Sequence, residues 1–292
     1  MSKTPTSKFT PPEDSVQDYE LADPIGDEAH EVAPGLIHRY PDRALLLVTN
    51  QCYIRCRFCF RKERLRKKNN FDLPQTATYL QQHPQIQEII FSGGDPLTLT
   101  LQEWETIYTA LIKIKHVKIW RIHTRIPIVN PGAVSQSYLS FLKKISQNKK
   151  LVIVLHVNHP RELTPVNQKL INQLLELKIM LLSQGVLLKG VNDDPQVLTT
   201  LFRQLVLSGI KPYYLHHLDK APGTHQFRVS VEEGKKIYQS LRGNLSGICI
   251  PEYVLDLPGG YGKVPVMWLE KISHKKYKAT NFRGEKIVYI DL

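Results

Sequence analysis

Short apolar segments alternate with helix-like segments along most of this chain, and this alternation constrains the fold more than any other feature. Six of the apolar segments read as buried strands: residues 43–49, 88–91, 117–123, 151–156, 179–184 and 212–217. The intervening helices are predicted over residues 73–82, 102–113, 134–146, 165–175 and 195–208. Such alternation forms parallel βα units with right-handed crossovers. Six units are too few for a closed eight-fold barrel, so we expect an α/β fold with an open, partial (βα)6 barrel.

The chain is expected to have three regions. Residues 1–33 are rich in Pro, Thr, Ser and acidic residues, which indicates a tail or an arm. Residues 34–225 hold the six βα units of the barrel. Residues 226–292 form a C-terminal segment, and its last part, residues 268–292, is expected to be a terminal hairpin.

Polar residues follow the predicted strands at the point where each strand ends. They are Cys52, Gly93 and Gly94, His123 and Arg125, His156 and Asn158, Gln184, and finally His217 and Asp219. In parallel α/β sheets the C-terminal ends of the strands carry the chemistry. Loops are polar in any protein, but this rim repeats the pattern at six strands. We therefore expect these residues to line a functional site.

Three of the four cysteines fall within eight residues, as Cys52-x-x-x-Cys56-x-x-Cys59. Three thiolates at this spacing can hold three irons of a cubane [4Fe–4S] cluster and leave the fourth iron open for a small molecule. A zinc knuckle is the alternative, but structural zinc takes four ligands, and the remaining cysteine, Cys249, is distant in the sequence. A disulfide with a spare thiol is a third reading, which the low cysteine density disfavours.

Composition narrows the classes of protein to which the chain can belong. No apolar run reaches the ~20 residues that cross a bilayer, and the N-terminus lacks an apolar signal core, so we expect a cytoplasmic protein without a membrane partner. The net charge of +12 suggests anionic partners such as phosphates or an acidic protein. The basic run 61–68 lacks interleaved aromatic residues, so nucleic acid is not expected as a partner. Most of this run is expected to be a solvated loop, except Arg61, which lies two residues after Cys59.

A glycine-rich segment near the C-terminus, Asp256-Leu-Pro-Gly-Gly-Tyr-Gly-Lys263, is a further candidate site. Glycines let the backbone approach a ligand closely, and amides in such a loop can face anions. Lys263 is a candidate Schiff-base partner for pyridoxal phosphate (PLP), provided that its pKa falls enough to give a free amine. The common alternative is an exposed lysine after an ordinary glycine-rich turn.

The cysteine motif, with an aromatic residue just before its third cysteine, resembles the radical S-adenosylmethionine (SAM) enzymes. Within them the chain resembles the lysine 2,3-aminomutase family, including its relative that supplies β-lysine for modifying elongation factor P. The matching segments are residues 34–43, the cysteine motif, and residues 91–97, 121–127, 156–160, 185–193, 212–214 and 256–263. The resemblance implies a partial, TIM-like barrel of the radical SAM type with a C-terminal extension. It also implies three cofactors: a [4Fe–4S] cluster, SAM and PLP.

The resemblance assigns roles position by position. Cys52, Cys56 and Cys59 would hold the cluster, and Lys263 would bind PLP covalently. Contacts to SAM are expected from Phe58, Ser92, Gly93, Gly94, Asp95, His156 and Gln184, and Arg125 is a further cofactor-binding candidate. PLP would be held by Arg39, Tyr40 and Arg43, although Arg43 can equally be a charge at the start of a strand. Substrate contacts would come from Arg61, at the carboxylate, and from Asp219 and Asp256, at the distal ammonium.

The reaction implied by the resemblance is that of an isomerase, which moves the amino group of L-lysine from the α- to the β-carbon. Two carboxylates attract the ammonium of lysine and repel glutamate, so a glutamate aminomutase is disfavoured. For Asp219, the alternative is a surface carboxylate paired with Lys220. An external electron donor such as flavodoxin or ferredoxin would reduce the cluster.

Two other functions remain open from the sequence. The same chemistry can be dedicated to supplying β-lysine for elongation factor P, and a non-catalytic, basic zinc- or RNA-binding protein is the second alternative. The segment before the similarity is short for a lysine 2,3-aminomutase, which leaves the oligomeric state open. No cysteine follows Cys249, so no structural zinc is expected near the C-terminus, and Cys249 itself is expected in the core.

Overall fold

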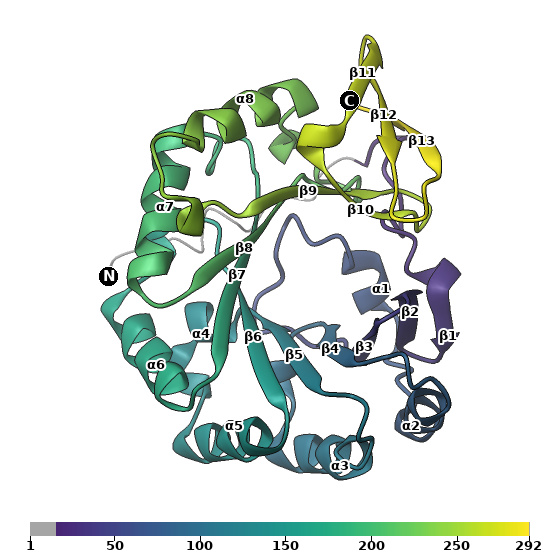
Figure 1. Ribbon diagram of the computed structural model, residues 1–292, viewed down its shortest axis with the longest axis vertical. Coiled ribbons are helices and arrows are strands. Elements are labelled where there is room, and N and C mark those ends of the chain that lie inside the picture. Colours follow the sequence, from purple (N-terminus) through teal and green to yellow (C-terminus); the bar gives the residue numbers. More distant parts are fainter. Residues whose placement is uncertain (1–15, 292) are drawn as a thin grey trace.

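Ten strands form one sheet in which the spatial order follows the order along the chain, and the sheet curves into an open barrel (Figure 1). This computed structural model describes residues 16–291, so the first fifteen residues of the expected N-terminal tail or arm lie outside the described part. Six neighbouring strands run parallel and match the six predicted ones. The expected partial (βα)6 barrel is confirmed by β3 (Arg43–Thr49), β4 (Glu88–Gly93), β5 (Ile119–Thr124), β6 (Lys150–His156), β7 (Met180–Val186) and β8 (Lys211–His216).

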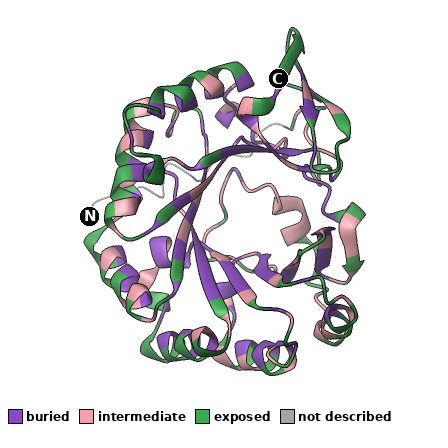
Figure 2. Ribbon diagram, in the orientation of Figure 1, coloured by how far each residue is buried: buried purple, intermediate pink, exposed green. Residues whose placement is uncertain are grey.

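Helices cover the outer face of the sheet, with their exposed sides turned to solvent (Figures 1 and 2). The five predicted helices form, and α8 was not foreseen: α2 (Leu73–Gln82), α3 (Leu101–Leu111), α5 (Gln136–Asn148), α6 (Pro165–Glu176), α7 (Pro195–Leu207) and α8 (Val231–Leu241). Each begins after an Asp, Ser or Thr whose side-chain oxygen accepts a backbone N–H of the first turn. Two short helices, α1 (Lys62–Arg66) and α4 (Ile126–Val129), complete the set. No helix within residues 16–291 combines the length and apolarity needed to span a membrane.

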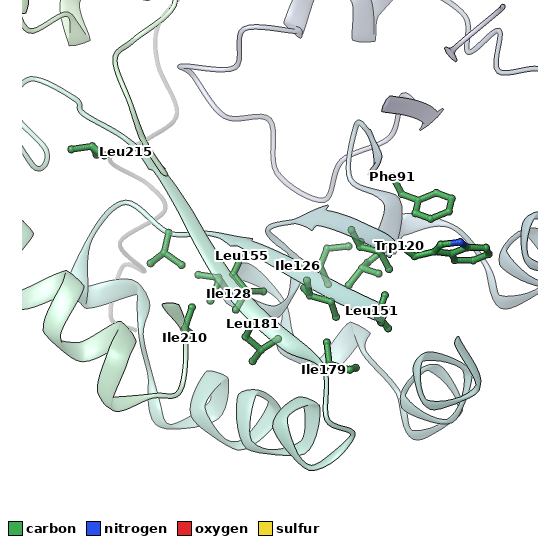
Figure 3. Packing of buried hydrophobic residues seen from close by; sticks show 14 of the residues in the cluster. Phe91, Trp120, Ile126, Ile128, Leu151, Leu155, Ile179, Leu181, Ile210 and Leu215 are labelled. Atoms are coloured by element: carbon green, nitrogen blue, oxygen red, sulfur yellow. The ribbon is translucent and has the colours of Figure 1, made fainter. Parts of the chain in front are cut away.

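The hydrophobic core lies between the sheet and the outer helices (Figure 3). In β5, Trp120 and Ile122 are fully buried in this core, and the ring of Trp120 packs 5.1 Å from that of Phe91. Alternate residues of a strand face opposite sides of the sheet, so Arg121 and His123 face the barrel interior. The core side is therefore apolar, and the interior is left to polar groups.

Two further strands extend the sheet beyond the six predicted ones. β9 (Glu252–Leu257) pairs parallel with β8, and β10 (Gly262–Pro265) pairs antiparallel with β9. Lys263 lies opposite Asp256 in this register. What the sequence suggested as a glycine-rich loop is therefore a β-hairpin, whose turn holds Gly259 and Gly260 at φ of 81° and 83°. At the other edge, β1 (Glu31–Ala33) and β2 (Leu36–Tyr40) precede β3.

The last part of the chain forms a small antiparallel sheet of three strands, where a two-stranded hairpin was expected. The strands are β11 (Glu270–Ser273), β12 (Lys276–Thr280) and β13 (Lys286–Ile290). The sequence of β11 has a single apolar residue and therefore no alternation of apolar and polar residues that would indicate a strand. In the structure all four of its residues are exposed. The small sheet packs on the barrel through buried Tyr277 and Tyr289, while Phe282 lies 4.9 Å from the ring of Tyr40 in β2.

Candidate active site

A cavity of about 280 Å³ lies inside the barrel, around the C-terminal ends of the parallel strands. The structure brings every residue that the resemblance assigned to a cofactor or to the substrate to its wall: Arg39, Tyr40, Arg43, Cys52, Cys56, Phe58, Cys59, Arg61, Ser92, Gly93, Gly94, Asp95, Arg125, His156, Gln184, Asp219, Asp256 and Lys263. Side chains from β2 through β10 thus share one enclosed space.

The loop with the three cysteines is packed directly on the glycines that end β4. The N–H of Gly94 donates to the carbonyl of Thr49 at 2.6 Å. A Cβ on Gly93, whose φ is 111°, would lie 2.3 Å from that same oxygen, and a Cβ on Gly94 would lie 2.1 Å from the carbonyl oxygen of Gln51. Any side chain at either glycine would therefore push the cysteine loop out of place.

The three cysteine thiols are free and have the chemistry of cluster ligands. Burial, with added repulsion from neighbouring thiolates, raises the pKa of Cys52 to about 12 and that of Cys59 to about 11. Ionised thiolates there need a positive partner, which iron supplies. Within the described residues no three His, Cys, Asp or Glu side chains are grouped to hold a single metal ion. The three cysteines lie on one short loop at the cavity wall, and three thiolates are the donor set of a cubane that keeps one iron open.

An aromatic stack and a charged side chain adjoin the cysteines. The rings of Phe58 and His156 stack with centroids 5.4 Å apart. Burial and the nearby Arg125 hold the pKa of His156 well below its usual value, so its ring is neutral. Arg125 donates to Cys56 Sγ at 2.8 Å and to Glu162 at 2.6 Å. A positive charge therefore sits against one of the candidate cluster ligands.

Asp95 joins the loops that follow β4 and β5. Its carboxylate accepts the hydroxyl of Thr124 at 2.6 Å and the backbone N–H groups of Leu97, Arg125 and Ile126 at 2.7 to 3.2 Å. Burial raises the pKa of Asp95, although these hydrogen bonds oppose the shift. The carboxylate of Asp95 is thus engaged by the chain itself and fixes the backbone around the cysteine loop.

On the wall of the same cavity Lys263 and Asp256 form a close ion pair. Their Nζ and carboxylate oxygens are 2.9 Å apart. Burial works to raise the pKa of Asp256, but Lys263 and His216 outweigh it and the pKa is lowered. Burial likewise works to lower the pKa of Lys263, but Asp256 outweighs it and the pKa is raised. Lys263 is therefore an ammonium here, whereas a Schiff base with PLP requires its free amine.

Asp219 faces the same cavity without taking part in this ion pair. Burial, followed by repulsion from Asp256, raises the pKa of Asp219 to about 8. Lys220 does not pair with it, because Lys220 Nζ donates to the carbonyl of Ile290 at 2.7 Å. The surface pair considered from the sequence does not form, and Asp219 is a carboxyl group available to a cation in the cavity.

Tyr40 and Arg43 link the start of the barrel to its end. The hydroxyl of Tyr40 accepts the backbone N–H of Lys263 at 2.8 Å. Arg43 lies over the ring of Tyr40, 3.9 Å from its centroid, and pairs with Asp42 at 2.7 Å. Tyr40 therefore fixes the strand that carries Lys263.

Two of the cavity residues were not predicted from the sequence, and one residue that was predicted at the cavity lies elsewhere in the structure. Asp27, in the region expected to be a tail or an arm, is buried and contacts both Arg39 and Arg61. His216 lines the cavity with its Nδ1 3.7 Å from Asp256. His217, which the sequence placed on the rim, instead turns away and meets the hydroxyl of Tyr253 at 2.8 Å. The two-residue period of β8 could have separated the histidines, since His216 shares the face of Tyr214.

Asn158 was also expected on the functional rim. It is fully buried, and its Oδ1 accepts the backbone N–H of Val186 at 2.8 Å. Asn192 Nδ2 in turn donates to the carbonyl of Asn158 at 2.9 Å. Asn158 therefore ties together the loops after β6 and β7 and does not reach the cavity wall.

Comparison with known proteins shows which proteins this chain resembles over most of its length. Residues 42–124 match a family described as a 4Fe-4S single cluster domain. A putative L-lysine 2,3-aminomutase from Aquifex aeolicus is 42% identical over 265 residues, which cover 88% of this chain and 70% of that protein. The chain belongs to the lysine 2,3-aminomutase family. The L-lysine 2,3-aminomutase of Escherichia coli is 38% identical over 84% of this chain and 71% of its own length.

Lysine 2,3-aminomutases can be considerably longer than this chain. The chain spans 58% of the L-lysine 2,3-aminomutase from Methanococcus maripaludis, at 37% identity. Among solved structures, a radical SAM methyltransferase from Sphaerobacter thermophilus aligns with a TM-score of 0.50 at 19% identity, over 75% of this chain and 68% of that one. That likeness concerns the fold and agrees with the expected radical SAM barrel. Family membership favours an enzyme over the non-catalytic zinc- or RNA-binding protein that the sequence left open.

Proposed function

We propose that the protein is an isomerase, a radical SAM and PLP-dependent L-lysine 2,3-aminomutase that converts L-lysine to β-lysine. The observation that carries the proposal is that the cysteine triad, Lys263 and the aspartates Asp219 and Asp256 line one cavity. The cluster with SAM supplies a radical that abstracts hydrogen, and PLP supplies delocalisation of the unpaired electron. The chain supplies binding and orientation of these groups.

The residues near the cysteines are proposed to bind SAM. Phe58 and His156 form a flat stack beside the triad, and Gln184 lines the same cavity. A neutral His156 can donate or accept one hydrogen bond through Nε2, which is buried and has no partner within the described residues. Arg125 is proposed to stabilise the thiolate of Cys56, since it already donates to that sulfur.

The residues around Lys263 are proposed to bind PLP and the substrate. Arg39 and Arg61 present guanidinium groups that suit a phosphate and a carboxylate. A lysine ammonium bound by Asp256 would compete for the carboxylate that now holds Lys263 in its charged form. Covalent attachment of PLP at Lys263 Nζ would remove this ion pair and leave the Asp256 carboxylate for the substrate ammonium.

The direct test is an anaerobic incubation with L-lysine, SAM, PLP and dithionite, followed by mass spectrometry of the products. We expect β-lysine, formed only when all four are present. As a check on the cluster, the anaerobic protein should be brown and carry about four irons per chain. A colourless protein that carries zinc and forms no β-lysine would contradict the proposal.

Replacing Asp219 with asparagine is expected to raise the KM for lysine by about 10- to 100-fold, because a buried carboxylate facing the ammonium is lost. Asp219 is neutral below its pKa of about 8, and an ammonium ligand favours the ionised form. Lysine itself keeps its side-chain charge up to about pH 10. The wild-type KM should therefore fall as the pH rises towards about 8, and this dependence should vanish in the variant.

The control for this prediction is Asp18→Asn, which removes an exposed carboxylate away from the cavity wall. Both variants are assayed by steady-state kinetics over the same pH range. Equal KM values for lysine in the Asp219 variant and the wild type would remove Asp219 from the substrate site.

The positive net charge of the chain is the basis for proposing its protein partners. The net charge of +12 suits acidic proteins, such as a flavodoxin or ferredoxin that delivers the electron. It would equally suit elongation factor P, if the β-lysine serves its modification. We propose a cytoplasmic location, because all four cysteines are free, as the reducing cytosol requires.

A further inference from the structure

Asp27 forms a buried ion triad with two arginines of the cavity. Its Oδ1 accepts a hydrogen bond from Arg39 at 3.0 Å, and its Oδ2 accepts one from Arg61 Nε at 2.9 Å. The side chains are 5%, 6% and 11% exposed for Asp27, Arg39 and Arg61. Removing one member of such a triad leaves the others buried with an uncompensated charge. The two guanidiniums are therefore held relative to each other by a single carboxylate.

The triad leaves specific N–H groups of both arginines for other ligands. Arg39 uses Nη2 for Asp27 and for the carbonyl of Ile25, while its buried Nε has no partner within the described residues. Arg61 uses Nε for Asp27 and Nη1 for the hydroxyl of Ser92 at 3.3 Å. Buried N–H groups are normally paired, so an orphaned one in a cavity wall indicates a missing acceptor. Both arginines thus retain donors for an anion.

The backbone that carries Asp27 is itself fixed against the strand hairpin that carries Lys263. The carboxylate of Asp23 accepts the N–H groups of Asp27 and Glu28 at 2.9 and 2.8 Å. A Cβ on Gly26, whose φ is 69°, would lie 2.2 Å from the backbone nitrogen of Gly260. His30 Nε2 lies 2.9 Å from the carbonyl oxygen of that same Gly260. The segment of residues 23–30 therefore contacts both Arg39 of β2 and the turn between β9 and β10.

We propose that Asp27 is a positioning residue that presets Arg39 and Arg61 for two anionic groups, the phosphate of PLP and the carboxylate of the amino-acid substrate. The identity of these two ligands rests on the proposed function, whereas the triad itself does not. A guanidinium that loses its carboxylate can rotate, and a misplacement of about 1 Å can cost about 10²-fold in rate. Asp27 acts through the arginines and need not touch either ligand.

The experiment compares Asp27→Asn with Glu28→Gln in the full chain, prepared anaerobically with its cluster. Glu28 is the next residue and also carries a salt bridge, but its partner Lys67 is exposed and both lie outside the cavity wall. The first measurement is the dissociation constant of PLP, titrated by its visible absorption without SAM or lysine. The second is kcat/KM for lysine in the wild-type and Arg61→Ala backgrounds.

For Asp27→Asn we expect the PLP dissociation constant to rise about tenfold and kcat/KM for lysine to fall about 10²-fold. In the Arg61→Ala background the same change should lower kcat/KM by much less, about tenfold, because only Arg39 remains to be misplaced. Glu28→Gln should match the wild type in both measurements. If Asp27→Asn does not fold, Asp27→Glu is measured by the same criteria, since it keeps the charge but displaces the carboxylate.

Two results would overturn the inference. One is a PLP dissociation constant and kcat/KM in Asp27→Asn equal to those of Glu28→Gln. The other is an equal loss of kcat/KM in both backgrounds, which indicates a general structural effect. A wild-type protein that binds PLP but forms no β-lysine would refute the proposed function alone, because the PLP titration still tests the triad.

Discussion

Replacing Lys263 with alanine is expected to abolish β-lysine formation, with turnover falling by roughly 10³-fold or more. Lys263 is the only lysine on the cavity wall within the described part of the chain. Its loss removes the only amine there that can hold PLP covalently. It also strips Asp256 of its 2.9 Å partner and leaves a buried carboxylate facing His216 and Arg39 at 3.7 and 3.9 Å.

The measurement combines product analysis with two binding assays. In the wild type, reduction with borohydride should attach PLP permanently to the peptide that contains Lys263, and in the variant no label should appear. SAM should still perturb the spectrum of the cluster, because the variant leaves the three cysteines of the motif unchanged. Lys271→Ala is the control, since Lys271 is exposed, pairs with exposed Glu232 and does not line the cavity. β-Lysine formation at the wild-type rate in the Lys263 variant would refute the assignment.

Replacing any one of the three motif cysteines with alanine is expected to remove the cluster and reduce turnover to background. The physical reason is that each thiolate is proposed to hold a separate iron, so the loss of one sulfur leaves a second iron without its protein ligand. Iron should fall from about four per chain to below about one. SAM cleavage under dithionite should disappear together with the brown colour.

Cys249→Ala provides the matched control for the cysteine variants. Cys249 is buried, 6% exposed, in the hydrophobic core and does not line the cavity. It should keep its iron and its activity, with at most a modest loss of stability from the smaller side chain. Loss of iron in Cys249→Ala with retention in Cys56→Ala would show that the triad is not the cluster site.

Periodicity and spacing along the chain were sufficient for the barrel and for the main chemical groups. The six apolar runs are strands because each is short and largely apolar and alternates with helical segments, and all of this information is local. The cysteine triplet is equally local, since its three ligands lie within eight residues. Asp256 and Lys263 were predicted mainly from the resemblance to the aminomutase family, and the sequence suggested a loop where the structure has paired strands.

Asp27 and His216 show what local patterns leave out. Asp27 lies among polar residues that resemble a tail, and nothing near it in sequence indicates that it meets Arg61 in a buried ion pair. His216 and His217 are neighbours of identical type, and only the register of β8 sends one to the cavity and the other to Tyr253. The pKa of Lys263 is a similar case, because its direction depends on Asp256 across the hairpin.

The sequence by itself determined the order of strands and helices, because these depend on residue types at short fixed spacings. It predicted the three candidate sulfur ligands from their spacing and the candidate amine from the family resemblance. The tertiary structure alone decided which charges neutralise each other and which buried groups are left for ligands. Gly26 against Gly260, and Tyr40 against Lys263, are contacts between the two ends of the barrel. Such pairs are set by the curvature of the whole sheet, which brings its two ends near each other and which no short stretch of sequence encodes.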